Sequence, residues 1–279
     1  MERTIKQQVT GFRTQDGAGV SLVRVLGGGT VEEYDPILML DSFDSTNPDD
    51  YTAGFPLHPH RGIETISYVY RGKMVHKDSL GNEDAISDGE VQWMTAGSGI
   101  LHEERLPASE RLLGVQLWLN LPAKSKMVAP AYRSIKSSEI EEIELEHGKL
   151  RLLAGSFEGR QGYSSKYLPL DYYDIHLNPQ GSVVIKTDRE RSIMLFTLLG
   201  DAFVAGELVK EKTAIKLTAG DQVEIKANEQ KAQVLFISST RLDEPVAWGG
   251  PIVMNTREEL RKAFDDLKQG TFLQKDISY

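Results

Sequence analysis

The sequence predicts an all-β protein with two β-rich halves and one helix near its C-terminal end. Short runs of alternating or β-branched residues recur along the chain, and turn dipeptides such as Asp88-Gly89 separate them. Such regular spacing is typical of a small barrel or sandwich. A strand pattern resembling part of the first half returns in the second half, which predicts two related domains.

Composition narrows the classes of function. The chain has 279 residues, enough for one large or two medium domains, and a formal net charge of -9. No cluster of Lys and Arg offsets that charge, so we expect no direct nucleic-acid binding and no membrane association. Cysteine is absent, which leaves histidine and carboxylate as the metal ligands. With no apolar signal segment and no run long enough to span a membrane, the expected location is the cytoplasm.

The first half contains the clearest strand signals. We expect strands over residues 5–9, 20–26, 36–40, 63–70, 74–77, 90–94 and 112–119. The Gly27–Gly29 run lacks the Lys-Ser/Thr of a phosphate loop and shows no helix signal behind it, so it predicts a turn. Residues 45–51 are expected to form a polar loop.

A connector is predicted over residues 122–150, where prolines precede an acidic run. Further strands are expected over 172–176, 182–185, 193–199 and 232–237. Residues 220–225 (Gly-Asp-x-Val-x-Ile) resemble residues 88–93, which indicates two copies of one fold. We place an N-terminal metal-binding domain at 1–135 and a C-terminal domain at 136–279, the latter without the histidine pairs and hence without a metal site.

The end of the chain predicts a helix. Thr256 and Glu259 form a capping box, and Leu260, Phe264 and Leu267 make one apolar stripe that ends at Gly270. A stripe this short indicates packing on the barrels rather than binding of a partner.

Two pairs of residues carry the functional signal: His58-Pro59-His60 and His102-Glu103-Glu104. Residues two apart on a strand point to the same face, so each pair presents two ligand side chains together. Three imidazoles and the Glu104 carboxylate suit Fe(II), Mn(II), Co(II), Ni(II), Cu(II) or Zn(II) and are a poor match for Ca(II). Four ligands leave two positions open in an octahedral ion. Since structural zinc sites are usually closed, this indicates reactivity or ligand sensing.

The other histidines and the nearby carboxylates are assigned roles one by one. Glu64 is expected to accept a hydrogen bond from a ligand imidazole, with direct ligation as the alternative. Glu104 is the carboxylate able to take a proton from a substrate hydroxyl, whereas Glu103 points to the opposite face. His76 is expected to be structural or exposed, and His147 and His176 are given no role.

These motifs resemble the pirins, which are bicupins of the cupin superfamily. The resemblance rests on four segments and spans nearly the whole chain: Asp35–Asp41, Phe55–Thr65 (FPLHPHRGIET), Gly89–Glu104 (GEVQWMTAGSGILHEE) and Gly250–Thr256. It implies two tandem cupin (jelly-roll β-barrel) domains. It also implies one divalent metal, usually iron, at His58, His60, His102 and Glu104, and a C-terminal cupin that has lost its metal.

The resemblance leaves three functions open. Some bacterial pirins look like quercetin 2,3-dioxygenases, which open a flavonol ring with O2 and release carbon monoxide. In that reading Fe(II) is expected first, flavonol oxygens enter the open metal positions, and Glu104 is the catalytic base. The second reading is a non-catalytic, iron-dependent, redox-sensing protein that binds a regulatory partner. The third is a cupin enzyme with another substrate, such as an isomerase. Pocket specificity is expected from the loop between Phe43 and Phe55.

Overall fold

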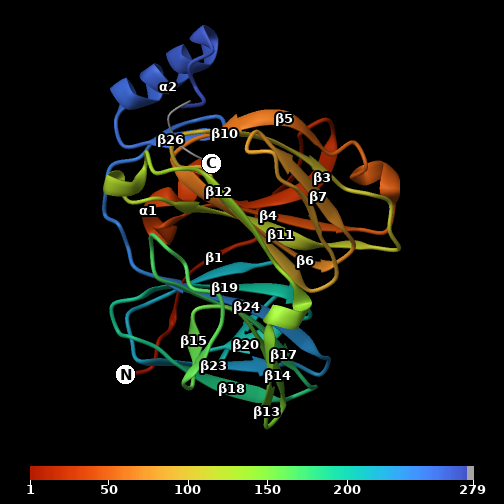
Figure 1. Cartoon of the computed structure of the whole chain (residues 1–279). Helices are drawn as coiled ribbons and strands as arrows, with labels where there is room; N and C mark the ends of the chain where they lie inside the picture. Colours follow the sequence, from red (N-terminus) through yellow and green to blue (C-terminus); the bar gives the residue numbers. More distant parts are fainter. Residues whose placement is uncertain (275–279) are drawn as a thin grey trace. The chain divides into compact units, whose positions relative to one another are not determined.

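Two sheets form a barrel in the first of two units of the computed structural model, which describes residues 1–274 (Figure 1). This N-terminal barrel belongs to a unit of residues 13–29, 37–137 and the segment from Leu242. Its large sheet has the order β12 (Ala131–Ile135), β9 (Glu90–Thr95), β6 (Ile63–Arg71), β11 (Leu112–Asn120), β4 (Ile37–Ser45), β3 (Val20–Leu26) and β2 (Phe12–Asp16). Its small sheet has the order β5 (Phe55–His60), β10 (Ile100–Arg105), β7 (Met74–Asp78) and β8 (Glu83–Ile86).

The C-terminal barrel, in the unit of residues 1–12, 30–36 and 138–241, repeats this order strand for strand. Its large sheet runs β1 (Ile5–Val9), β22 (Ala214–Leu217), β19 (Ser192–Leu199), β24 (Ala232–Ser239), β17 (Leu170–Leu177), β14 (Gly148–Ala154) and β13 (Glu141–Leu145). Its small sheet runs β18 (Ser182–Lys186), β23 (Gln222–Ala227), β20 (Ala202–Val204) and β21 (Glu207–Val209). The predicted repeat is therefore confirmed.

The sequence likeness behind that prediction joins strands that are not equivalent. Residues 222–225 lie in β23, whose place in the small sheet corresponds to β10. Residues 90–93 lie in β9, in the large sheet. Both segments follow a turn and alternate apolar with polar residues, a pattern shared by most half-buried strands. The pattern thus identified strands correctly but not their place in the barrel.

The units differ at both ends from the predicted division at residue 135. β1, red in Figure 1, pairs with β22 and gives the C-terminal barrel an edge strand, as β12 does beside β9 in the N-terminal barrel. The last segment, with β25 (Ala247–Gly249), β26 (Ile252–Met254) and α2 (Arg257–Gln269), belongs with the N-terminal barrel. The predicted connector over residues 122–150 contains β12, β13 and the start of β14.

Residues close in the sequence determine where α2 begins and ends. Thr256 Oγ1 accepts from the backbone N–H of Glu259 at 3.1 Å, the Glu259 carboxylate accepts from the N–H of Thr256 at 2.9 Å, and Gly270 ends α2 with a φ of 71°. Leu260, Phe264 and Leu267 pack against a buried cluster that includes Ile252 and Met254. The triple glycine forms the predicted turn, a 3-10 turn at Gly28–Thr30, and the short helix α1 (Val31–Tyr34) follows it although the sequence shows no helix signal there.

The remaining elements are short. A hairpin joins β15 (Ser156–Phe157) and β16 (Arg160–Gln161), and 3-10 turns lie at Gly28–Thr30, Pro48–Asp50, Ala123–Ser125 and Ser137–Glu139. Within residues 1–274, no helix has the length and hydropathy that crossing a membrane requires.

Candidate metal centre

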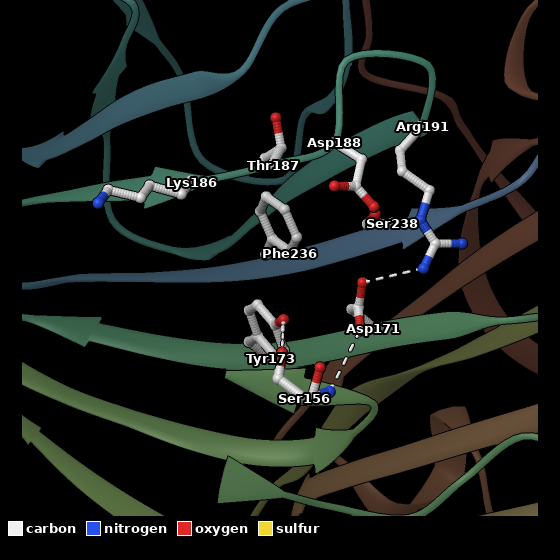
Figure 2. A pocket seen from close by; sticks show the side chains of 9 residues that line it. All are labelled: Ser156, Asp171, Tyr173, Lys186, Thr187, Asp188, Arg191, Phe236 and Ser238. Carbon is white, nitrogen blue, oxygen red and sulfur yellow. Dashed lines mark hydrogen bonds and ion pairs between the residues drawn. The ribbon is translucent and has the colours of Figure 1, made fainter. Parts of the chain in front are cut away.

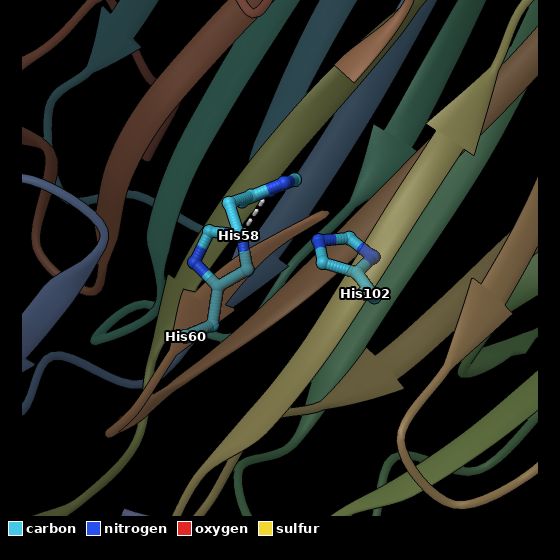
Figure 3. A group of neighbouring side chains, drawn as sticks. All are labelled: His58, His60 and His102. Atoms are coloured by element: carbon cyan, nitrogen blue, oxygen red, sulfur yellow. Dashed lines mark hydrogen bonds between the residues drawn. The ribbon is translucent and has the colours of Figure 1, made fainter. Parts of the chain in front are cut away.

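Strands β5 and β10 bring the predicted histidines together. They pair antiparallel, with His102 opposite His58 and Ile100 opposite His60. β5 is an edge strand and contains Pro56 and Pro59. Proline has no backbone N–H to donate, and an edge strand tolerates this because one of its sides has no partner strand. The register shifts between His102 and Glu104. As predicted from the spacing, the imidazoles of His58 and His60 leave the strand on one face (Figure 3).

The three imidazoles form a compact group. Each offers one ring nitrogen, and these nitrogens lie within 4.8 Å of one another. His58 Nε2 and His60 Nε2 are 3.0 Å apart, the contact dashed in Figure 3. His60 and His102 are buried and His58 is half-buried. His58 is therefore the most exposed member of the group.

Hydrogen bonds assign the other ring nitrogens. His58 Nδ1 lies 2.8 Å from the carbonyl oxygen of Pro56, and His60 Nδ1 lies 3.0 Å from that of Pro251. A carbonyl only accepts, so both Nδ1 atoms carry the proton and both Nε2 atoms present lone pairs. Two lone pairs facing each other at 3.0 Å require a proton or a cation between them. This donor set therefore fits a metal ion.

Burial keeps the inner imidazoles neutral, as a metal requires. It lowers the pKa of His60 to about 3, with the neighbouring His58 adding to the effect. Burial, together with the other histidines, lowers the pKa of His102 well below its usual value. His102 Nε2 is buried and has no hydrogen-bond partner among the described residues, so its lone pair is available.

Glu104 is buried beside this group but does not belong to it by distance. Its carboxylate accepts from Gln92 Nε2 at 2.8 Å and from Gln116 Nε2 at 3.1 and 3.2 Å. Both amides donate to the carboxylate and hold it in place. Sequence reasoning missed the two glutamines, although a single Gln within an apolar strand, as in Val91-Gln92-Trp93, signals a buried polar partner.

Glu64 does not accept from a ligand imidazole in this structure. Its Oε1 accepts from Thr95 Oγ1 at 2.7 Å, across the pairing of β6 and β9, and its Oε2 is buried without a partner in the described residues. Burial raises the pKa of Glu64. The Nδ1 atoms of His58 and His60 face the carbonyls of Pro56 and Pro251 instead, and His102 Nδ1 lies 3.3 Å from a ring nitrogen of His76.

His76 is neither exposed nor isolated. It is fully buried, its Nε2 lies 2.8 Å from Asp78 Oδ2, and its Nδ1 lies 3.3 Å from His102 Nδ1. The signal for this contact was present in the sequence as a third i, i+2 pair, His76-x-Asp78. Glu103 is half-buried and reaches toward Arg105, on the other face of β10 as expected.

A cavity of about 600 Å³ adjoins His58 and His60. Its apolar wall consists of Met39, Phe55, Trp118 and Trp248, and the Trp118 ring meets His60 edge-on, with centroids 5.1 Å apart. Of the loop expected to line it, only Phe55 contributes. Residues 248–251 line it instead, a contribution from the far end of the chain that no local pattern reveals.

The opposite wall of this cavity is charged. Arg24 donates to both carboxylate oxygens of Asp41, at 3.0 and 2.8 Å, and to Asp16 Oδ2 at 2.7 Å. Gln116, which holds Glu104, also lines the cavity. The cavity thus combines flat apolar surfaces with fixed donors and acceptors, as small-molecule sites do.

Comparison with known proteins identifies the family. A profile of the pirin family matches residues 19–119, and one of the pirin C-terminal cupin domain matches residues 172–273. A pirin-like protein of Caulobacter vibrioides is 41% identical over 277 residues, covering 97% of this chain and 99% of its own. The chain belongs to the pirin family.

Solved structures agree with this assignment. Quercetin 2,3-dioxygenase from Acinetobacter baumannii superposes on this pirin with a TM-score of 0.90 at 30% identity, covering 98% of this chain and 99% of its own. A bacterial pirin from Escherichia coli, solved in complex with nickel(II), gives a TM-score of 0.67 at 20% identity, covering 84% and 98%. At that identity the second match shows the shared fold alone.

The C-terminal barrel of this pirin has a smaller, polar cavity of about 250 Å³ (Figure 2). Asp171, on its wall, accepts from the backbone N–H of Ser156 at 3.2 Å and pairs with Arg191 at 3.4 Å. Lys186, Thr187 and Ser238 add further polar groups. No histidine lines it, so within the part of the chain described the metal-ligand group and the aromatic cavity belong to the N-terminal barrel.

Proposed function

We propose that this pirin is a metal-dependent dioxygenase that cleaves a flavonol-type aromatic compound with O2. The observation that supports it most is the meeting of a three-imidazole group with an aromatic-walled cavity of about 600 Å³, a volume typical of small-molecule sites. The similarity to a quercetin 2,3-dioxygenase over nearly the whole chain supports the same reaction. The reaction opens the flavonol ring with O2 and releases carbon monoxide.

The metal would be held by His58, His60 and His102. Glu104 stays our proposed fourth ligand, although its carboxylate lies beside the three-imidazole group and not within it. Fe(II) is our first expectation, and Ni(II), Mn(II), Co(II), Cu(II) and Zn(II) are the alternatives that this donor set allows. When bound, such an ion supplies open coordination positions and redox chemistry with O2.

The protein's own residues would bind and orient the substrate. Trp118 and Trp248 present flat surfaces to aromatic rings. The buried indole N–H of Trp118, which has no partner among the described residues, is a donor for a substrate oxygen. Glu104, held in place by Gln92 and Gln116, would take the proton of the substrate hydroxyl.

The test is O2-dependent loss of quercetin absorbance by Fe(II)-loaded protein. We expect turnover in the wild type and none in His58→Ala, because that variant removes one imidazole of the metal group. Glu104→Gln keeps an oxygen that accepts from both glutamines but lacks the basic carboxylate, so we expect retained metal and strongly slowed turnover. Full activity in Glu104→Gln would remove the base role. No turnover in wild type shown to hold one metal per chain would overturn the dioxygenase and favour the regulatory reading.

A further inference from the structure

We propose that Asp78 and His76 set the tautomer of His102, so that His102 Nε2 is left without a proton and free to bind the metal. The inference rests on the metal-binding part of the proposed function. It concerns residues of β7 that are not metal ligands, and it assigns them a positioning role.

Strand pairing places the three side chains in one row. β7 and β10 are antiparallel, with Asp78 opposite His102 and His76 opposite Glu104. The row runs from Asp78 Oδ2 to His76 Nε2 at 2.8 Å, and from His76 Nδ1 to His102 Nδ1 at 3.3 Å. His102 Nε2 lies at its end.

The direction of the first hydrogen bond in the row follows from Asp78. Its carboxylate accepts from the backbone N–H groups of Leu80 and Asn82, at 2.9 and 3.1 Å, and from Asn82 Nδ2 at 2.9 Å. Burial alone would raise the pKa of Asp78, but hydrogen bonds from His76 and Asn82 outweigh it and lower this pKa. The carboxylate is therefore an acceptor only.

An acceptor at Asp78 fixes both rings in turn. His76 Nε2 must donate to it, which leaves His76 Nδ1 as an acceptor, since a neutral imidazole carries one N–H. His102 Nδ1 then carries the proton and donates to His76. The proton that would block His102 Nε2 is thus held on the other side of the ring.

Burial and stacking hold the two rings in place. His76 is fully buried and His102 is 1% exposed, so bulk water does not replace either partner. The Tyr132 ring stacks on His76, with centroids 4.1 Å apart and planes 10° apart, which fixes the plane of the imidazole.

The C-terminal barrel shows the same positions without a metal group. By strand order and register, Ala202 and Val204 on β20 correspond to His76 and Asp78, and Ile225 on β23 corresponds to His102. In the C-terminal barrel the counterparts of the two supporting residues are apolar, and so is the counterpart of the ligand His102. This pairing is expected if the supporting residues serve the ligand.

Asp78→Asn is the decisive variant. The backbone N–H groups of Leu80 and Asn82 would keep the amide oxygen, which turns the amide NH2 toward His76 Nε2. His76 must then accept there and donate from Nδ1, so His102 loses its acceptor and carries its proton on Nε2. We expect affinity for Ni²⁺ to fall by about 10- to 100-fold, measured by competition with a chromophoric chelator.

A second pair of variants keeps the test valid if Asp78→Asn does not fold. His76→Phe removes the acceptor and should weaken Ni²⁺ binding similarly. His76→Asn places an amide oxygen near the position of Nδ1 and should restore most of the affinity. The matched control is Asp174→Asn in the C-terminal barrel, where His176 Nε2 lies 2.8 Å from Asp174 Oδ2; Ni²⁺ affinity should be unchanged there.

The direct readout needs neither metal nor turnover. In metal-free protein labelled with 15N-histidine, NMR should show His102 protonated at Nδ1 in the wild type and at Nε2 in Asp78→Asn. A wild-type His102 protonated at Nε2, or equal Ni²⁺ affinity in a folded Asp78→Asn, overturns the inference. Wild type with the expected tautomer and tight Ni²⁺ binding but no quercetin turnover would instead remove the dioxygenase proposal and leave this one standing.

Discussion

The two barrels share one strand order, but equivalent positions of their small sheets carry different kinds of side chain. Four positions on the small sheet of the N-terminal barrel carry the predicted ligands, and their counterparts by register are apolar: His58 and Val183, His60 and Ile185, His102 and Ile225, Glu104 and Ala227. Ile185, Ile225 and Ala227 belong to the main apolar cluster of the C-terminal barrel. The same strand order therefore carries the three-imidazole group in one barrel and an apolar core in the other, and the side chains at these positions make the difference.

The cavities of the two barrels also differ in the side chains that line them. The cavity of the N-terminal barrel is lined by two tryptophans, a phenylalanine and two histidines, whereas that of the C-terminal barrel is smaller and mostly polar. Both draw on corresponding strands: β4, β5 and β11 in one, β17, β18 and β24 in the other. The position of the cavity is therefore a property of the fold, and its contents are specific to each barrel.

The largest expected effect comes from truncating one equivalent position in each barrel. His102→Ala should reduce bound metal from one per chain to almost none while the protein remains folded. Ile225→Ala should keep the metal but lower the free energy of unfolding by about 2–5 kcal/mol, because it leaves a cavity in a packed core. Metal analysis and urea unfolding of both variants measure the contrast. Metal loss in Ile225→Ala at full folding would contradict the division of roles.

A smaller effect is expected from pH on metal-free protein. The unfolded chain protonates its histidines at their ordinary pKa near 6.5, whereas burial lowers the pKa of His60 to about 3 in the folded protein. Because the pKa of His60 is lower in the folded protein than in the unfolded chain, the free energy of unfolding is highest above about pH 6.5 and falls as the pH drops toward 3.

The loss should reach at most about 1.4 kcal/mol per pH unit for each buried histidine. Urea unfolding at several pH values measures it. His60→Gln should flatten the dependence, while Val183→Ala in the C-terminal barrel should leave its slope unchanged. A slope equal in wild type and His60→Gln would show that His60 does not titrate this way.

The smallest expected effect concerns the helix of the N-terminal unit. Thr256→Ala removes the side-chain oxygen that accepts from the Glu259 N–H and should lower the free energy of unfolding by about 1 kcal/mol. Thr256→Ser keeps that oxygen and is the matched control. Hydrogen exchange should locate the loss in α2 and in strands of the N-terminal barrel; faster exchange confined to the C-terminal barrel would contradict the assignment of the helix.

Features with a local signature could be predicted from the sequence. Alternation predicted the strands, the capping residues predicted α2, and the i, i+2 spacing predicted that His58 and His60 share a face with room for His102. Features that join distant segments could not. The Pro251 carbonyl that holds His60 and the pairing of β1 with β22 depend on how the barrel closes, and no residue pattern near either partner encodes it. His76 is an intermediate case. Its i, i+2 spacing from Asp78 could be read from the sequence, but its burial could not.

The contact between His60 and Pro251 has a consequence for biosynthesis. The two residues are 191 positions apart, and the Nδ1–H of His60 has its acceptor only when residue 251 is in place. A ribosome has made most of the chain, including all three histidines, before it reaches that proline. The imidazole group therefore reaches its final form only late in translation, after residue 251 has been added.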